Sequence, residues 1–365
     1  MVCKALVVGA YQRKLEEIAR LGVELTCIVP PFWRQSGRDL VLERAHTEGY
    51  EMIVEPIRWN GSFHLFYFPG LGAHLSRLRP EIVHIDEEPY NLATFLATRL
   101  AIKVAARPLF FTWQNLHRRY PPPFSWLERY VLRHAQHAVA GNAEAADVLR
   151  KKRYPGPVSV IPQFGVDPEQ FSPQPSRQWA VGSGKSFTIG YLGRLVEEKG
   201  LLVLLDAVRG LEAHWRLELY GHGPLLTKLK RQVQTLGLSD RVAFYQTVPS
   251  DVVPERLRRL DVLVLPSLTR RNWKELFGRV LIEAMACGVP VVGSTSGEIP
   301  NVIGEAGLLF REGDAAELHA CLAELMASER RRAELAARGR VRVLERYTHQ
   351  KIAEATVKVY RGMIA

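Results

Sequence analysis

Short apolar runs alternate with helix-forming stretches along this chain, and that alternation limits the fold more than any other feature. Residues 23–30, 81–86 and 108–112 are typical of buried strands, whereas residues 92–105 and 143–153 are typical of helices. A chain that repeats strand and helix in this way forms a parallel sheet with helices on both faces. The first half therefore predicts one doubly wound α/β unit.

The first residues predict a strand of that sheet. The run "KALVVGA" at residues 4–10 is short, and the charged stretch at residues 11–17 follows it at once, so the segment does not resemble a signal peptide. We expect Gly9 to end this first strand and Gly22 to close the helix after it. No stretch reaches about 18 uncharged apolar residues, so no transmembrane helix is expected.

A segment rich in Pro, Gly and Ser separates two rounds of this alternation. We predict an N-terminal domain at residues 1–170, joined by a C-terminal helix at 350–365, then a linker at 171–186 and a second domain at 187–349. Open parallel sheets bind ligands outside the carboxyl ends of their strands. Two such sheets predict a bilobal ligand-binding protein or an enzyme.

The charge and the cysteine content indicate which classes of partner and which cellular compartment the protein favours. The formal net charge is +11, which favours anionic partners such as nucleic acid, an acidic membrane face or phosphorylated small molecules. The surplus is spread over both halves and forms no basic tail. The four cysteines are isolated, so the sequence predicts neither a disulfide framework nor a zinc site and favours a reducing compartment.

Two carboxylates in the stretch "KELFGRVLIEAMACGVPVV" form the main candidate site. Glu275 and Glu283 have seven residues between them, and a helix begins near Gly278. The backbone N–H groups of Phe277, Gly278 and Arg279 would point out of that helix end, where the helix dipole favours an anion. Glu275 would lie on the loop before the helix and Glu283 within it.

The pair of carboxylates predicts a ligand with hydroxyls on both sides of an anion. Carboxylates accept hydrogen bonds from hydroxyls and repel phosphate oxygens, so a nucleotide sugar, with its hexose, diphosphate and ribose, fits the arrangement. The structural alternative stays open: Glu275 would help to cap the helix and Glu283 would be solvated.

The whole string resembles the signature of retaining glycosyltransferases with the GT-B fold, the large family four of "glycosyl transferases group one". The resemblance covers nearly all of residues 186–350 and is looser before them. It implies an α/β fold of two Rossmann-like, doubly wound parallel-sheet domains that face each other across a cleft. It also implies a retaining hexosyltransferase, independent of metal, that uses a nucleotide-diphosphate sugar and a hydroxyl acceptor in glycan biosynthesis.

The resemblance assigns roles on the donor side. Glu275 would contact the donor sugar, Glu283 would hold the ribose hydroxyls, and the amides of Phe277 and Gly278, with Arg279 beside them, would lie at the sugar or its phosphate. In the motif "IGYLGRLVEEKG", two further residues match cations that neutralise the diphosphate: Arg194 and Lys199. Without the resemblance, two such cations would be read as surface residues.

Two glycines are weaker donor-side candidates. Gly221 lies in "LYGHGP", which resembles a glycine loop near the nucleotide but is also compatible with an ordinary turn between strand and helix. Gly9 could approach the donor phosphate, although this chain reads "GAYQRK" where many relatives carry a double glycine. That departure leaves the role of Gly9 open.

The acceptor side departs further from the family pattern. Relatives often carry a histidine after a strand like "PLFFTW", where this chain has Asn115, with His117 a little beyond. Glu87 and Tyr90, in the polar cluster "HIDEEPYN", could bind acceptor hydroxyls, or the cluster could be a solvated loop. Asn142 is typical of a helix cap.

Rival functions remain. A two-domain sugar-nucleotide epimerase shares the fold, and a non-catalytic sugar-nucleotide-binding subunit would share the site, whereas the absence of GxGxxG disfavours a dehydrogenase. We expect no metal, no cofactor beyond the donor substrate, no nucleic-acid partner and a cytoplasmic location. Peripheral contact of residues 71–80 and 133–156 with the inner face of an anionic membrane stays open. The sequence does not specify the sugar, nucleobase, acceptor, linkage or oligomeric state.

Overall fold

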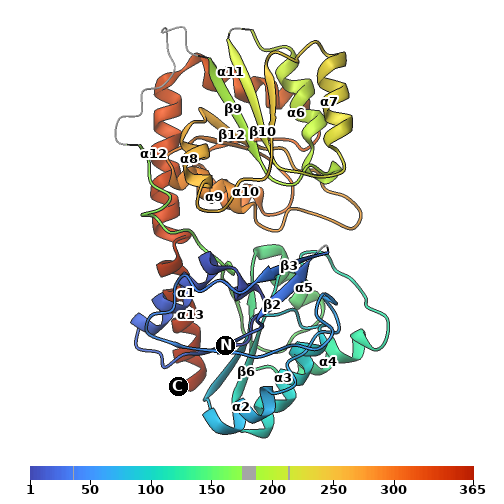
Figure 1. Cartoon of the computed structure of the whole chain (residues 1–365), viewed down its shortest axis with the longest axis vertical. Coiled ribbons are helices and arrows are strands. Elements are labelled where there is room, and N and C mark those ends of the chain that lie inside the picture. Colours follow the sequence, from blue (N-terminus) through green and yellow to red (C-terminus); the bar gives the residue numbers. More distant parts are fainter. Residues whose placement is uncertain (36, 175–185, 213) are drawn as a thin grey trace. The chain divides into compact units, whose positions relative to one another are not determined.

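A computed structural model describes residues 1–35, 37–174, 186–212 and 214–365. The chain forms two compact units: unit 1 contains Met1–Gly165 and His349–Ala365, and unit 2 contains Val166–Thr348 (Figure 1). Most of the predicted linker, residues 175–185, lies outside the described residues.

Unit 1 is built on two groups of parallel strands that a single residue connects into one sheet. The strands β1 (Thr26–Val29) and β4 (Glu51–Val54) pair with each other, and β5 (Ile82–Ile85), β6 (Arg107–Thr112), β7 (His137–Ala140) and β8 (Val158–Val160) pair in that order. Val2 forms parallel bridges to Ile28 and Ile85 and so connects the two groups. An exposed antiparallel hairpin, β2 (Phe32–Gln35) and β3 (Arg38–Val41), lies outside this sheet.

The predicted first strand is wrong. The segment Ala5–Val7 forms a 3-10 helix, η1, and Gly9 is the first residue of α1 (Gly9–Arg20). The chain leaves the sheet at Lys4, whose backbone N–H donates to Glu87 Oε1 (2.9 Å) instead of to a strand. Because Leu6 and Val7 are buried in the core as a turn, their apolar character could not distinguish a turn from a strand.

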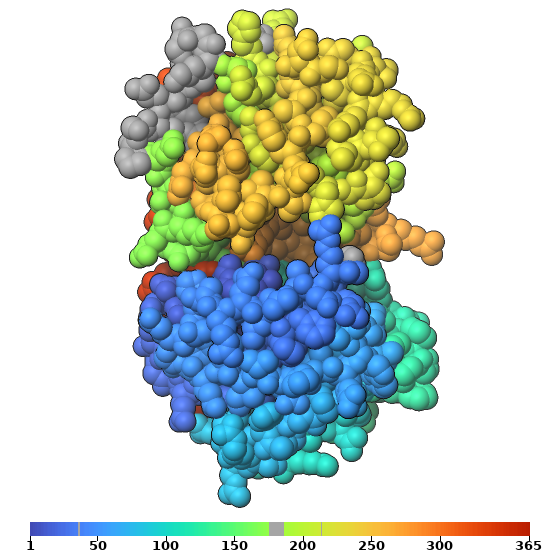
Figure 2. All heavy atoms as spheres, in the orientation of Figure 1, coloured from blue at the N-terminus to red at the C-terminus, as the bar shows by residue number. Residues whose placement is uncertain are grey.

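Helices cover the sheet of unit 1. They are α1, α2 (Leu71–Leu78), α3 (Leu92–Lys103), α4 (Phe124–His134), α5 (Ala143–Lys151) and α13 (His349–Ile364). Asn142 caps α5, since its Oδ1 accepts from the N–H of Ala145 (2.7 Å), which confirms the predicted cap. The C-terminal helix α13 packs along α1 (Figure 1). In the space-filling view the blue N-terminal residues hide most of this red helix (Figure 2).

Unit 2 is a second doubly wound sheet with six parallel strands. Their order is β11 (Val242–Tyr245), β10 (Trp215–Tyr220), β9 (Phe187–Leu192), β12 (Val262–Leu265), β13 (Val291–Ser294) and β14 (Leu308–Phe310). The connections turn in opposite directions from β9, so the strand order reverses between β9 and β12. An open sheet of this kind binds its ligand at such a reversal.

The helices of unit 2 follow its strands in the predicted alternation. They are η2 (Glu197–Lys199), α6 (Leu201–Arg209), α7 (Leu226–Thr235), α8 (Val253–Arg258), α9 (Arg279–Ala286), α10 (Ile299–Ile303), α11 (Ala315–Ala327) and α12 (Glu329–Arg346). The predicted fold class, two doubly wound parallel sheets, is confirmed. Among the described residues no helix combines the length and the apolar character needed to cross a membrane.

Candidate functional site

Two loops of unit 2 meet where the strand order reverses. One follows β9 and contains Lys199, and the other follows β12 and contains Glu275. The loops are joined by a hydrogen bond from the N–H of Leu268 to the carbonyl of Glu198 (2.8 Å). Gly200 permits this approach: its φ is 65°, and a Cβ there would lie 1.9 Å from the carbonyl oxygen of Pro266.

Lys199 and Glu275 form an ion pair at this point. The Nζ of Lys199 lies 2.5 Å from Glu275 Oε2, and the Oγ of Ser267 donates to the same oxygen at 2.7 Å. Glu275 is only 6% exposed, so these two donors stabilise a carboxylate that is largely shielded from water. The ring of Trp273 covers the ammonium of Lys199 at 5.0 Å from ring centroid to Nζ.

The second carboxylate lies on the helix that follows. The helix α9 begins at Arg279 after Gly278, which has a φ of 77° and provides no side-chain cap. Arg279 Nε lies 2.8 Å from Glu283 Oε1. Burial raises the pKa of Glu283, and the guanidinium of Arg279 opposes that rise.

The structural alternative for the two carboxylates is wrong. Glu275 does not cap α9, because α9 has no side-chain cap and the Glu275 carboxylate instead pairs with Lys199. Glu283 is not solvated, because it is 9% exposed. Both carboxylates are therefore held inside unit 2 by cations, an arrangement that a ligand with its own charges and hydroxyls could exchange.

The remaining donor-side residues differ in their surroundings. Arg194 lies on the same loop as Lys199, but its side chain is 62% exposed, and within the described residues its ion pair is with Glu198, at 3.6 Å. Gly221 has a φ of 149°, and a Cβ there would lie 1.9 Å from the carbonyl oxygen of Gly193, so it brings two loops together. The ring of Phe277 is buried against Tyr347.

Gly9 begins a helix instead of ending a strand. Its N–H donates to Glu43 Oε2 (2.6 Å), and a Cβ would lie 2.7 Å from the Cβ of Ala45. The carboxylate of Glu43 thus occupies the position at the amino end of α1 that the sequence analysis gave to a phosphate. A carboxylate there would repel a phosphate, which argues against the predicted role.

The polar cluster after β5 in unit 1 is buried, so the solvated alternative is wrong. Lys4 pairs with Glu87, and Lys14 Nζ lies 3.0 Å from Asp86 Oδ2. Tyr90 is also buried, with its ring centroid 4.3 Å from that of Tyr120. Glu87 and Asp86 are therefore each paired with a lysine inside unit 1.

The two residues after β6 separate in the structure. Asn115 is buried, and its Nδ2 donates to Glu144 Oε2 (3.2 Å). His117 is exposed and lines a hollow that also contains several Arg and Lys side chains. Asn115 and His117 thus belong to different surroundings.

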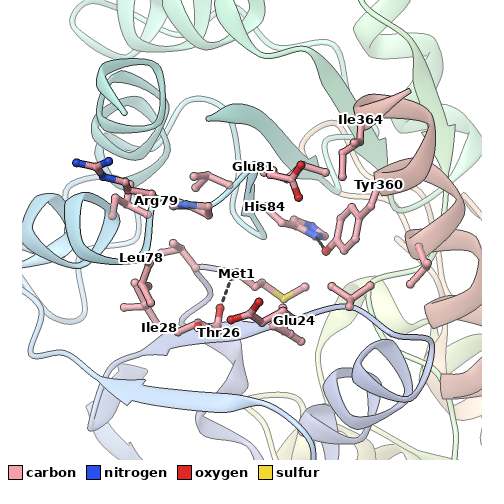
Figure 3. Close-up of a pocket in the computed structure, with 18 of the residues that line it drawn as sticks. Met1, Glu24, Thr26, Ile28, Leu78, Arg79, Glu81, His84, Tyr360 and Ile364 are labelled. Atoms are coloured by element: carbon pink, nitrogen blue, oxygen red, sulfur yellow. Dashed lines mark hydrogen bonds between the residues drawn. The ribbon is translucent and has the colours of Figure 1, made fainter. Parts of the chain in front are cut away.

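A cavity of about 490 Å³ opens at the amino ends of β1 and β5 in unit 1 (Figure 3). His84 and Tyr360 point toward each other there, with 2.6 Å between His84 Nδ1 and the tyrosine oxygen. Burial lowers the pKa of His84 to about 3, so its ring is neutral. The cavity lies at the opposite strand ends from those that bind ligands in open sheets, and we assign it no function.

Sequence reasoning missed two residues that shape these sites. Ser267 donates to Glu275 in unit 2, and Glu43 covers the amino end of α1 in unit 1. The position of Ser267 directly after the apolar run of β12 was a usable signal, because side chains after strands gather at one edge of a parallel sheet. Nothing local marked Glu43, which acts across 34 residues.

Two family models match the sequence. The model described as "Glycosyltransferase Family 4" matches residues 12–170, and the model described as "Glycosyl transferases group 1" matches residues 176–342. The second range contains Lys199, Glu275 and Glu283 of the unit 2 site.

Curated relatives agree with these models. The GDP-mannose-dependent alpha-(1-6)-phosphatidylinositol monomannoside mannosyltransferase of Mycolicibacterium smegmatis is 31% identical over 198 residues, which cover 51% of this chain and 52% of the relative. The D-inositol 3-phosphate glycosyltransferase of Stackebrandtia nassauensis is 30% identical over 276 residues, which cover 69% of this chain and 60% of the relative. The chain thus spans about half to three fifths of the length of these relatives.

A solved structure extends the likeness to the whole fold. The Anabaena protein Alr3699/HepE in complex with UDP aligns with a TM-score of 0.73 and 18% identity, and the alignment covers 99% of this chain and 98% of that one. At this level of identity the likeness concerns the fold.

Proposed function

Because the chain belongs to the glycosyl transferases of group 1, a family with the GT-B fold, we propose that it moves a hexosyl unit from a nucleotide-diphosphate sugar to a hydroxyl group of an acceptor. The acceptor is a glycan, a lipid-linked molecule or a small molecule, and transfer retains the configuration at the anomeric carbon. One observation carries the proposal: the buried Lys199–Glu275 pair, at 2.5 Å, lies where the strand order of unit 2 reverses.

Lys199 would stabilise the leaving diphosphate. Negative charge develops on that group as the sugar bond breaks, and a cation held in place beforehand lowers the barrier. Lys199 is held by Glu275 and Trp273, so it is positioned before the donor arrives. Arg194 on the same loop would add a planar fork of donors, and its exposed side chain has room to turn toward the phosphates.

The two carboxylates would bind the hydroxyls on either side of the diphosphate. Glu275 would accept from the donor sugar and Glu283 from the ribose, with the diphosphate near the amino end of α9, where the helix dipole favours an anion. Arg279 holds Glu283 in place through the 2.8 Å pair and brings a further positive charge to that helix end.

Retention would follow from attack on the face that the diphosphate leaves. The acceptor oxygen bonds to the anomeric carbon while the bond to the diphosphate breaks, and the departing phosphate takes the hydroxyl proton. No metal ion is needed for this scheme, since Lys199 and Arg194 supply positive charge. We expect transfer to continue in excess EDTA, and loss of activity that added Mg²⁺ restores would refute the metal-independent scheme.

The identity of the donor sugar nucleotide is the first property to determine. A thermal-shift panel of UDP-, GDP-, ADP- and dTDP-sugars would identify the nucleotide, and the GDP-mannose requirement of the Mycolicibacterium relative makes GDP-mannose the first candidate. The stabilising donor is then incubated with hydroxyl acceptors, and the anomeric configuration of the product is read by NMR. An isomerised donor without transfer would favour an epimerase, and binding without turnover would favour a non-catalytic subunit.

Location is a further part of the proposal. A cytoplasmic enzyme in peripheral contact with an anionic membrane would be consistent with the formal net charge of +11. Fractionation of cells that express the tagged chain tests this location, and a protein that stays in the soluble fraction at low salt would contradict the membrane contact.

A further inference from the structure

Unit 1 contains a strongly basic hollow of about 720 Å³, which we call the cationic hollow. Its positive side chains come from three elements: Arg118 and Arg119 from the loop after β6, Arg129 and Arg133 from α4, and residues 151–153 from the end of α5. The donor-side residues in unit 2 are not part of it.

The charge in the hollow is far from balanced. Seven Lys or Arg residues line it, and Glu128 is the one carboxylate among the lining residues. The surplus of six positive charges is more than half of the formal net charge of the chain, +11. Glu128 is already paired with Lys152, which also donates to Gln114 Oε1 at 2.9 Å.

Five of these cations have no acidic partner. Arg119, Arg129, Arg133, Lys151 and Arg153 are exposed, and none forms an ion pair in the described part of the chain. By contrast, the Nη1 of Arg150, next to them on α5, lies 2.6 Å from Asp147 Oδ1. Gathering unpaired like charges in a concave site costs free energy, which an anionic ligand would recover.

The chemistry of the lining selects phosphate groups. Guanidinium groups present planar pairs of donors that match phosphate oxygens, and a phosphate ester or diphosphate carries enough charge to engage several of them at once. We propose that the cationic hollow binds the phosphate or diphosphate group of an anionic ligand. This goes beyond the glycosyl transfer proposed above and does not depend on it.

One neighbouring residue bears on the source of that phosphate. Trp126 is 61% exposed and lies three and seven residues before Arg129 and Arg133, so all three share one face of α4. An exposed tryptophan beside cations is typical of contact with the headgroup region of a membrane. The phosphate can thus belong to a lipid headgroup or to a soluble phosphate ester, and the experiment below separates the two.

The test uses two double variants of the full chain with the same loss of charge. The first is Arg129→Gln with Arg133→Gln, in the hollow. The control is Arg99→Gln with Lys103→Gln, two exposed cations on α3 that form no ion pair in the described residues. Both pairs are made in a Lys199→Ala background, so that the diphosphate position in unit 2 contributes little to binding.

Binding is measured with two probes. Inorganic pyrophosphate is titrated by calorimetry, and phosphatidylcholine vesicles with and without phosphatidylglycerol are tested by cosedimentation. We expect the background protein and the control to bind at least one probe, and the hollow variant to bind it about tenfold more weakly or worse, with a smaller dependence on salt. Binding of pyrophosphate alone assigns a soluble ligand, and binding of the anionic vesicles alone assigns a lipid.

Two outcomes would overturn the proposal: equal binding by the two variants, or no binding of either probe by the background protein. Circular dichroism confirms that both variants fold. Because the readout is binding and not turnover, the proposed transferase activity can fail without affecting this result, and the hollow can fail while transfer persists.

Discussion

At the scale of single residues, Lys199 and Glu275 depend on each other. Glu275 is 6% exposed and receives hydrogen bonds from Lys199 and Ser267, so the lysine directly stabilises a buried negative charge. If the lysine is removed, the carboxylate remains buried, and the free-energy cost of its burial is no longer offset by the ion pair. The pair is therefore a structural contact as well as the proposed centre of donor chemistry.

We expect Lys199→Ala to lower the free energy of unfolding by about 2–4 kcal/mol, because it removes the cation that pairs with the buried Glu275 carboxylate. Arg194→Ala is the control on the same loop. Its side chain is 62% exposed, so we expect a change below about 0.5 kcal/mol. Both variants should slow transfer, since each removes positive charge from the leaving group. Urea unfolding and steady-state kinetics measure the two effects, and equal stability of the two variants would contradict this account.

Glu88 is a second single residue with a testable effect: it makes the stability of the fold depend on pH. Burial raises its pKa to about 7, although Thr112 Oγ1 and the N–H of Trp113 donate to its carboxylate at 2.7 and 2.8 Å. The ordinary pKa of this group is 4.5, so the folded protein binds the proton more tightly than the unfolded chain does. The stability contributed by Glu88 is therefore complete below the ordinary value and is lost as pH rises through about 7.

We expect Glu88→Gln to remove this part of the pH dependence. The melting temperature of the wild type should fall relative to that of the variant between about pH 5 and pH 8, by an amount equivalent to about 1–3 kcal/mol. Glu24→Gln, an exposed carboxylate without an ion pair in the described residues, serves as the control. Parallel melting curves for the wild type and Glu88→Gln over that range would disprove the assignment.

At the scale of elements, the apolar pattern explains most of the fold. The strands β9, β12 and β13 are almost entirely buried, so their short apolar runs could be recognised, and Gly288 with Pro290 marked the end of α9. The turn Ala5–Val7 was taken for a strand because both are apolar when buried. The hairpin of β2 and β3 has no such run and was missed.

The sequence predicted those residues of the candidate site that lie together in one local motif. Glu275, Glu283 and Gly278 lie in one stretch, whereas the contact between Lys199 and Glu275 joins positions 76 residues apart. The order of strands in the sheet decides that these two residues meet, and local periodicity does not specify that order. Gly9 and Glu43 show the same limit in unit 1, since their contact follows from how the chain folds back on α1.

The approach of the two site loops can be tested through a glycine. We expect Gly200→Ala to destabilise unit 2 by several kcal/mol, because its Cβ would lie 1.9 Å from the carbonyl oxygen of Pro266 and its φ is 65°. Gly237→Ala is the matched control: its φ is 67° with no atom within 4 Å, so about 1 kcal/mol is expected from backbone strain alone. Denaturant unfolding compares them, and similar losses would mean that the loops do not need close contact.

At the scale of the whole molecule, the C-terminal helix completes the unit formed by the first residues. Helix α13 buries Ile352, Val357 and Tyr360 in the core of unit 1, while unit 2 ends at Thr348. The chain therefore passes from unit 1 to unit 2 and returns. Each unit has its own sheet, but only unit 2 is made from one continuous segment.

Removing residues 349–365 should unfold unit 1 and leave unit 2 intact. The loss of several buried side chains exceeds the few kcal/mol that stabilise a typical domain. Hydrogen exchange should show loss of protection in residues 1–165 and retained protection in residues 187–348. Removing only the largely exposed residues 362–365 is the control and should change neither. Loss of protection throughout the chain would show that the two units fold together.

The return of the chain to unit 1 has a consequence during translation. Residues 166–348 are all translated before the helix that packs along α1 has been made. Residues 1–165, although translated before unit 2, thus complete their fold after it. Until then they expose apolar surface to the cell. Chaperone binding to nascent chains of this protein should concentrate on that early segment and end when residues 349–365 emerge.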